Sequence, residues 1–311
     1  MAGLLTETFL AALLYGAVSA GVPLWLAGLG EQISEKAGVL NIGLEGMMLC
    51  GAYAGFVAAW TSGSFALGFV AGAAAGLLVA LVVILLCVRL GLDQIVVGIA
   101  LTVGAQGLTA LLHHFQFARS YPRLPAAASW PLPVLADLPV VGPALFDRHP
   151  VVYLAVLLVP ALAVMQRRLR LELQLRAAGD RPEALDVAGV DVRVVRGLAV
   201  AATGTLAGLG GAFLANLGAG LFVPFVTNGA GFIAIVLAML ARGRPLWVLL
   251  GAMLFGACLS LTTAIQVAGS NVPTDLVQML PFAAVMLVLV LIGRRARLPA
   301  ALGRPYVRGG G

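Results

Sequence analysis

The sequence predicts an all-α membrane protein with about eight or nine transmembrane helices in a single domain, residues 1–311. Of its residues, 61% are hydrophobic and 10% are charged, and its mean hydropathy is +1.04. Soluble domains carry about 25% charged residues, so this composition excludes an ordinary soluble protein. Apolar stretches of about 20 residues, enough to cross a bilayer, recur along the chain. Lipid offers the backbone no hydrogen-bond partners, so these stretches are expected to be helices.

Nine apolar stretches are candidates for these crossings. The second and the seventh look broken or short, and we expect broken or re-entrant segments near 37–60 and 224–241. If residues 37–60 form a re-entrant hairpin, the count falls to eight and the N-terminus changes side, and the sequence leaves both possibilities open. The nine stretches are 8–30, 37–60, 64–88, 92–115, 151–165, 197–217, 229–241, 245–267 and 276–293.

The basic residues indicate an orientation. With nine crossings, 16 of the 19 Lys and Arg residues fall on one side of the membrane, together with the C-terminal tail. Short loops rich in Lys and Arg stay in the cytoplasm, so we expect this side to be cytoplasmic. The net charge of +6 therefore reflects topology and not nucleic-acid binding. A cleavable signal peptide is not expected, because Glu7 precedes the first apolar run and the first basic residue is Lys36.

The long polar segment 167–196 is expected to project into the cytoplasm, since its charges are costly in lipid. Its middle predicts a short helix. Asp180 is the candidate N-cap, Pro182 lies in the first turn, and Gly189 suits a left-handed C-cap. Composition alone leaves open whether this helix is a solvated connector or a docking surface.

The other polar segment, 116–150, contains seven prolines that break any long helix. It is expected to lie outside the cell, either as a partner surface or as a stiff connector. Within the spans, glycines recur at spacings that let membrane helices approach closely. They are Gly68, Gly72, Gly76, Gly204, Gly208, Gly210 and Gly211.

Two interrupted apolar stretches carry the candidate substrate pathway. Asn41 and Glu45 lie in the first, and Thr227 and Asn228 in the second. In transporters, broken segments at corresponding places in the two halves often form the substrate path, because unwound backbone supplies hydrogen bonds. The alternative for Glu45 is that it caps a neighbouring helix.

The sequence contains no motif that indicates an enzyme. His113 and His114 lack acidic residues or cysteines at ligand spacing, so no metal site is expected. The chain has no phosphate-binding loop of the form G-x-x-x-x-G-K-[ST], since its only lysine, Lys36, lies in an unrelated context. If ATP drives this protein, another polypeptide binds it, and this chain is a transport subunit without its own cofactor.

Several long motifs resemble a known family. The run 31–48, EQISEKAGVLNIGLEGMM, closely resembles the signature of ABC-importer permeases for nucleosides and simple sugars. This type belongs to the inner-membrane translocator superfamily that also serves ribose and branched-chain amino acids. Further similarities cover most of the chain, at 94–98, 138–143, 176–184, 204–208 and 229–235.

The resemblance implies a permease subunit of an ATP-driven importer in a bacterial-type inner membrane. It implies three kinds of partner: an ATPase subunit that holds ATP and Mg, a second permease that is a related chain or another copy, and an extracytoplasmic solute receptor or lipoprotein. The alternative is an ion-coupled secondary transporter, in which Glu45 would be the ion-linked carboxylate. In the family, the cytoplasmic loop is a coupling helix that docks on the ATPase. Carried over, it gives the candidate contacts Gly179, Arg181, Pro182, Glu183, Ala184 and Gly189, with Arg181 where members often have Asn.

Overall fold

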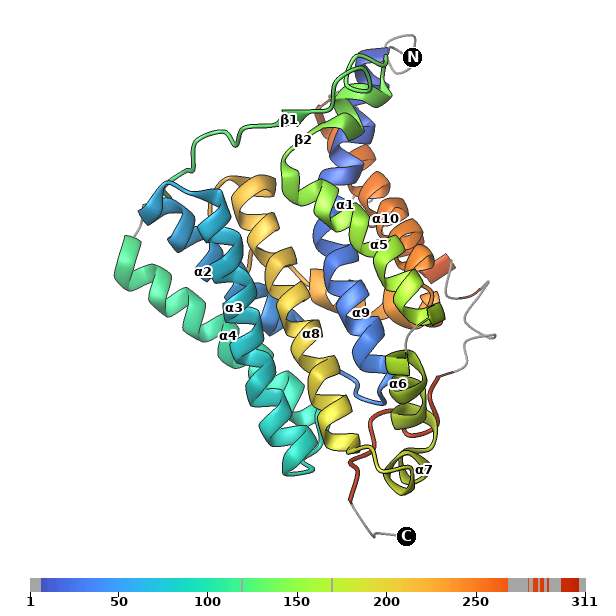
Figure 1. The fold of residues 1–311 in the computed structure, drawn as a ribbon. Helices are drawn as coiled ribbons and strands as arrows, with labels where there is room; N and C mark the ends of the chain where they lie inside the picture. The colour runs from blue at the N-terminus through green and yellow to red at the C-terminus, as the bar shows by residue number, and fades with distance from the viewer. Residues whose placement is uncertain are drawn as a thin grey trace.

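The fold is a bundle of long helices, seen in a computed structural model (Figure 1). The structure describes residues 7–118, 120–168, 170–267 and 298–307, with a few positions between the last two ranges. These few are residues 279, 282–284, 286–287 and 290. The predicted span 276–293 lies largely outside the described residues, so the number of crossings stays a prediction.

The regular secondary structure of the described chain is helical apart from two antiparallel strands of two residues each, β1 (Trp130–Pro131) and β2 (Asp147–Arg148). Five described helices are long and apolar enough to cross a membrane, or six if the pair α5 and α6, bent by 79°, counts as one span. The predicted all-α polytopic membrane fold is therefore confirmed. The helices are α1 (Glu7–Lys36), α2 (Leu44–Ser62), α3 (Phe65–Val83), α4 (Gln94–Phe117), α5 (Pro150–Arg168), α6 (Arg170–Asp180), α7 (Pro182–Val187), α8 (Val192–Phe213), α9 (Ala230–Ala241) and α10 (Pro245–Val267), with π-helical turns η2 (Ile84–Arg89), η3 (Gly142–Phe146) and η4 (Leu214–Ala219).

Helix α1 lies at the centre, and α8 and α10 run antiparallel to it (Figure 1). The hydroxyl of Thr203 in α8 donates to the carbonyl of Gly30 at 2.7 Å, and the hydroxyl of Ser260 in α10 donates to that of Leu13 at 2.9 Å. Each bond gives a hydroxyl group an acceptor where lipid provides none, and joins two helices. The three helices are thereby fixed in register along most of α1.

The close helix approach predicted from the glycine spacings is found between α3 and α8, at a contact that we call the glycine seam. A Cβ added at Gly208 would meet the carbonyl oxygen of Gly72 and lie 3.0 Å from the Cα of Gly76. The two backbones therefore touch directly at this point. Such contact gives membrane helices their packing energy, because the hydrophobic effect does not drive them together in lipid.

Helix boundaries differ from the prediction near residue 37. Helix α1 continues beyond the expected end at residue 30 to Lys36, and residues 37–43 form an irregular connection before α2 begins at Leu44. The extra turns contain Glu31 and Glu35, which are 0% and 6% exposed. Neighbouring segments of the protein cover these polar residues. Hydropathy does not register such contacts, so the predicted end of the helix at residue 30 was wrong.

Segment 116–150 is held against α1 by Arg148. This arginine is 4% exposed, and its guanidinium donates to the carbonyl of Ala144 at 2.7 Å and to the hydroxyl of Ser19 at 2.9 Å. It also lies 3.5 Å from the ring centroid of Tyr15, a cation–π contact. Burial lowers the pKa of the adjacent His149, which favours the neutral imidazole.

We predict that Gly208→Ala destabilises the protein although Ala is the better helix former. The new methyl group would push α3 away from α8, outweighing the gain of about 0.5–1 kcal/mol in helix propensity. Thermal unfolding of purified protein in detergent would show a lower midpoint. Gly104→Ala in α4 is the control, since a Cβ there meets nothing within 4 Å. Equal midpoints for the two variants would contradict the seam.

Candidate translocation pathway and coupling segment

Glu45 joins the two interrupted segments. Its Oε1 accepts hydrogen bonds from the Thr227 hydroxyl at 2.5 Å and from the Gly229 N–H at 2.9 Å. Its Oε2 accepts from the Gly231 N–H at 2.6 Å. Thus two residues predicted to share a pathway, Glu45 and Thr227, are in direct contact although 182 positions separate them.

The Glu45 carboxylate caps the N-terminus of α9. The first backbone N–H groups of a helix have no partner inside the helix, and the positive end of the helix dipole attracts a carboxylate. Glu45 is 2% exposed, so these three donors take the place of water around its oxygens. Its two oxygens are therefore committed to helix capping, the alternative that the sequence had left open.

Asn41 is held by α1 and not by the Glu45 network. Its backbone N–H donates to Glu31 Oε1 at 3.0 Å, and its side-chain nitrogen contacts the sulfur of Met47 at 3.3 Å. The preceding residue, Leu40, donates its backbone N–H to Gln94 Oε1 at 2.8 Å. The irregular connection 37–43 is thus supported by side chains from α1 and α4.

Thr227 and Asn228 line a cavity of about 680 Å³ between α1, α10 and the chain that precedes α9. Ser19 and Thr262 add two hydroxyl groups to its wall, and Phe255 and Phe282 add aromatic surface. None of the described residues lining this cavity is charged. A cavity with scattered hydroxyl and amide groups on apolar walls suits an uncharged polar solute.

A second cavity, of about 970 Å³, lies at the other end of α1. Its lining mixes both signs of charge. The basic residues outnumber the acidic ones, which makes this end of the bundle electropositive. The charged residues are Glu35, Lys36, Arg176, Asp180, Arg242 and Arg244.

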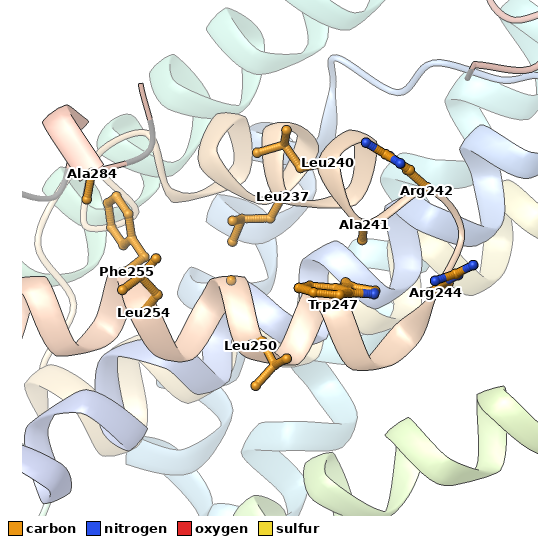
Figure 2. Close-up of a pocket in the computed structure, with 11 residues that line it drawn as sticks. Leu237, Leu240, Ala241, Arg242, Arg244, Trp247, Leu250, Leu254, Phe255 and Ala284 are labelled. Atoms are coloured by element: carbon orange, nitrogen blue, oxygen red, sulfur yellow. The ribbon is translucent and has the colours of Figure 1, made fainter. Parts of the chain in front are cut away.

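A smaller, largely apolar pocket of about 350 Å³ lies between α9 and α10 (Figure 2). Leu237 and Trp247 point into the space between the two helices, while Arg242 and Arg244 lie at the end where the chain turns from one helix to the other. The pocket shares Arg242, Arg244 and Trp247 with the charged cavity, so the α9–α10 turn borders both.

The predicted short helix exists as α7, although its N-cap differs from the prediction. Asp180 is the last residue of α6, and the N-cap of α7 is Arg181, which makes no side-chain capping bond. The C-terminal end follows the prediction: Gly189 has a φ of +83°, and its N–H donates to the Asp186 carbonyl at 2.9 Å. The Val190 N–H donates to Leu185 at 3.2 Å, which completes a Schellman motif.

Helix α7 presents one face to solvent. Pro182 and Leu185 are buried, whereas Glu183, Ala184 and Val187 are exposed. Val187, at 89% exposure, is the most exposed large hydrophobic residue in the described chain. Single apolar side chains are common on protein surfaces, so Val187 marks the solvent-facing side of α7 and does not by itself define a docking face. Sequence reasoning missed it, although the i, i+4 spacing from Glu183 was a usable signal.

Helix α6 packs against the end of α1. The Lys36 Nζ lies 2.9 Å from Glu172 Oε1, and both side chains are largely buried. A Cβ added at Gly179 would collide with the Lys36 carbonyl oxygen, so only glycine allows this approach. Glu172 also pairs with Arg176 at 2.8 Å. The predicted coupling residue Gly179 is therefore a packing contact to α1.

Comparisons with known proteins converge on one family. Residues 13–291 match the family described as branched-chain amino acid transport system / permease component. The chain is 40% identical over 285 residues to the putative glucose ABC transporter permease protein TsgC13 of Haloferax volcanii, covering 91% of this chain and 85% of that protein. It is 30% identical to the nucleoside ABC transporter permease protein NupC of Lactococcus lactis and to the guanosine ABC transporter permease protein NupQ of Bacillus subtilis. Each of these two comparisons covers 92% of this chain and 93% of the relative.

We predict that Glu45→Gln lowers stability, because the amide NH₂ would face a backbone N–H that needs an acceptor. The expected loss is about 1–3 kcal/mol, the cost of an unsatisfied buried donor. Thermal unfolding in detergent measures it, and Glu7→Gln at the exposed start of α1 is the control. An unchanged midpoint combined with lost transport would instead favour an ion-linked carboxylate.

Proposed function

The chain belongs to the branched-chain amino acid transport system / permease component family, and from this premise we propose that it forms the path for nucleosides or simple sugars in an ATP-driven importer. It is a multi-pass membrane protein and a permease subunit of an ABC transporter. The relatives named for glucose, nucleosides and guanosine support this substrate class. The observation that carries it here is the uncharged cavity lined by Thr227 and Asn228.

Sugars and nucleosides are uncharged and carry several hydroxyl groups. The hydroxyl and amide groups of the cavity supply transient hydrogen bonds, and its aromatic surface offers an apolar face for a sugar ring or base. Weak contacts suit a permease, since a tightly bound solute leaves slowly. Glu45 and Asn41 contribute indirectly in this proposal: they hold the two irregular segments that shape the path.

The proposed ATPase contact is the exposed face of α7. The ATPase subunit holds ATP and Mg, and its movement pushes on this helix, so that the helices alternate between outward and inward access. The excess of Arg and Lys at this end favours the cytoplasmic side of a bacterial-type inner membrane, with the C-terminus in the cytoplasm.

The remaining proposed partners are a second permease, either a related chain or another copy, and an extracytoplasmic solute receptor or lipoprotein. The receptor contact is the outer segment 116–150. It exposes Trp130 at 64% and Val134 at 78%, and apolar residues presented to water favour a partner surface.

We predict that uptake in proteoliposomes containing the complete transporter requires internal ATP and stops when the ATPase subunit loses its phosphate-loop lysine. Ala184→Arg should abolish uptake by placing a bulky charge on the docking face, while membrane insertion and the solute cavity remain intact. Ala184→Ser, which adds only a small uncharged group at the same exposed site, is the control and should transport normally. Uptake driven by a proton gradient without nucleotide would contradict this proposal.

We predict that Ala20→Trp blocks most uptake of labelled nucleoside or glucose, since Ala20 lines the uncharged cavity. The matched control is Ala100→Trp on the exposed face of α4, which should transport normally. Assembly with the partner subunits is measured alongside. Normal uptake by an assembled Ala20→Trp transporter would remove this cavity from the path.

A further inference from the structure

Arg196 of α8 connects three distant parts of the chain. It is 3% exposed, and its guanidinium donates to three backbone carbonyl oxygens. Nε contacts Ala37 at 3.1 Å, Nη2 contacts Ala178 at 3.1 Å, and Nη1 contacts Arg304 at 2.8 Å. These acceptors belong to the end of α1, the last turn of α6 and the C-terminal segment 298–307.

The location explains why a buried cation is stable there. The last carbonyls of a helix have no partner inside the helix, and the helix dipole makes this end negative. Ala37 directly follows α1, and Ala178 lies in the last turn of α6, so Arg196 meets two negative helix ends. The planar guanidinium holds five N–H donors in fixed directions, which suits several separate acceptors.

The C-terminal segment closes the same junction. The Ala301 N–H donates to the Gly179 carbonyl at 2.8 Å, and the Gly303 N–H donates to the Gly38 carbonyl at 3.1 Å. The segment therefore bridges α6 and the residues that follow α1, beside the two carbonyls that Arg196 holds. We call the set formed by Arg196, the ends of α1 and α6, and residues 298–307 the arginine junction.

We propose that Arg196 is a positioning residue that transmits movement of α7 to the transmembrane helices through the arginine junction. This inference rests on the proposed docking of an ATPase on α7. Only Arg181 separates α6 from α7, so a push on α7 reaches the end of α6 at once. From there Arg196 connects it to α1, which lines the solute cavity, and to α8, to which Arg196 itself belongs.

The role depends on the shape of the guanidinium and not only on its charge. A lysine at this position keeps the positive charge but carries its three donors on one nitrogen, which cannot reach three carbonyls in different directions. Arg196→Lys thus preserves the electrostatics of the two helix ends while disconnecting parts of the junction. Movement of α7 would then shift α6 without shifting α1 and α8.

The test compares ATP hydrolysis with solute uptake by the complete transporter in proteoliposomes. For Arg196→Lys we expect ATP hydrolysis to continue while uptake falls, so that fewer solute molecules enter per ATP hydrolysed. A merely structural defect would instead lower both rates in proportion to the amount of assembled complex. Arg193→Lys, one turn earlier on the exposed face of α8, is the control. A wild-type ratio for Arg196→Lys would overturn the inference.

Deleting residues 298–311 provides a second variant in case Arg196→Lys does not assemble. It removes the Arg304 acceptor and the two bridging N–H donors, so the uptake-to-ATP ratio should fall in the same direction. An unchanged ratio would overturn the role of the junction. A wild-type complex that takes up solute without consuming ATP would refute the proposed function itself, which distinguishes the two failures.

Discussion

The arrangement of this protein depends on how buried polar groups are satisfied where lipid excludes water. The clearest case is Glu45, whose carboxylate accepts the hydroxyl of Thr227 and two backbone N–H groups at the start of α9. Without these bonds, a helix beginning inside the bundle would leave two backbone N–H donors unpaired, each at a cost of several kcal/mol. With them, the chain before α9 can be irregular and line a cavity. The shape of this cavity therefore depends on one satisfied carboxylate.

Arginines play the complementary part at the two ends of the bundle. Arg148, beside Tyr15 of α1, and Arg196, beside the end of α1 at Lys36, are both nearly inaccessible, and both donate to backbone carbonyl groups from other segments. Each fastens a peripheral segment onto α1: the outer segment through Arg148, and α6 with the C-terminal segment through Arg196. Carbonyl oxygens at chain turns and helix ends stabilise these buried guanidinium groups, because such carbonyls otherwise lack hydrogen-bond partners.

The sequence predicted what depends on local composition. Hydropathy indicated a polytopic helical fold, the glycine spacings predicted close helix packing without naming the α3–α8 pair, and the interrupted stretches indicated Glu45 and Thr227. It failed where distant contacts decide: α1 continues through Glu31 and Glu35 because other helices cover them, and α6 extends through Asp180. The role of Arg196 was missed because its three acceptors come from segments up to 159 residues away. A usable signal was its position seven residues before Thr203, on the buried face of α8.

Because α1 is fastened near both ends, it behaves as a single rod across the membrane. From Lys36 to Tyr15 it runs roughly 30 Å at 1.5 Å per residue, so a tilt imposed at Lys36 displaces Tyr15 in the opposite sense. The two ends of the bundle would then move in step through one helix, without a relay of intervening contacts.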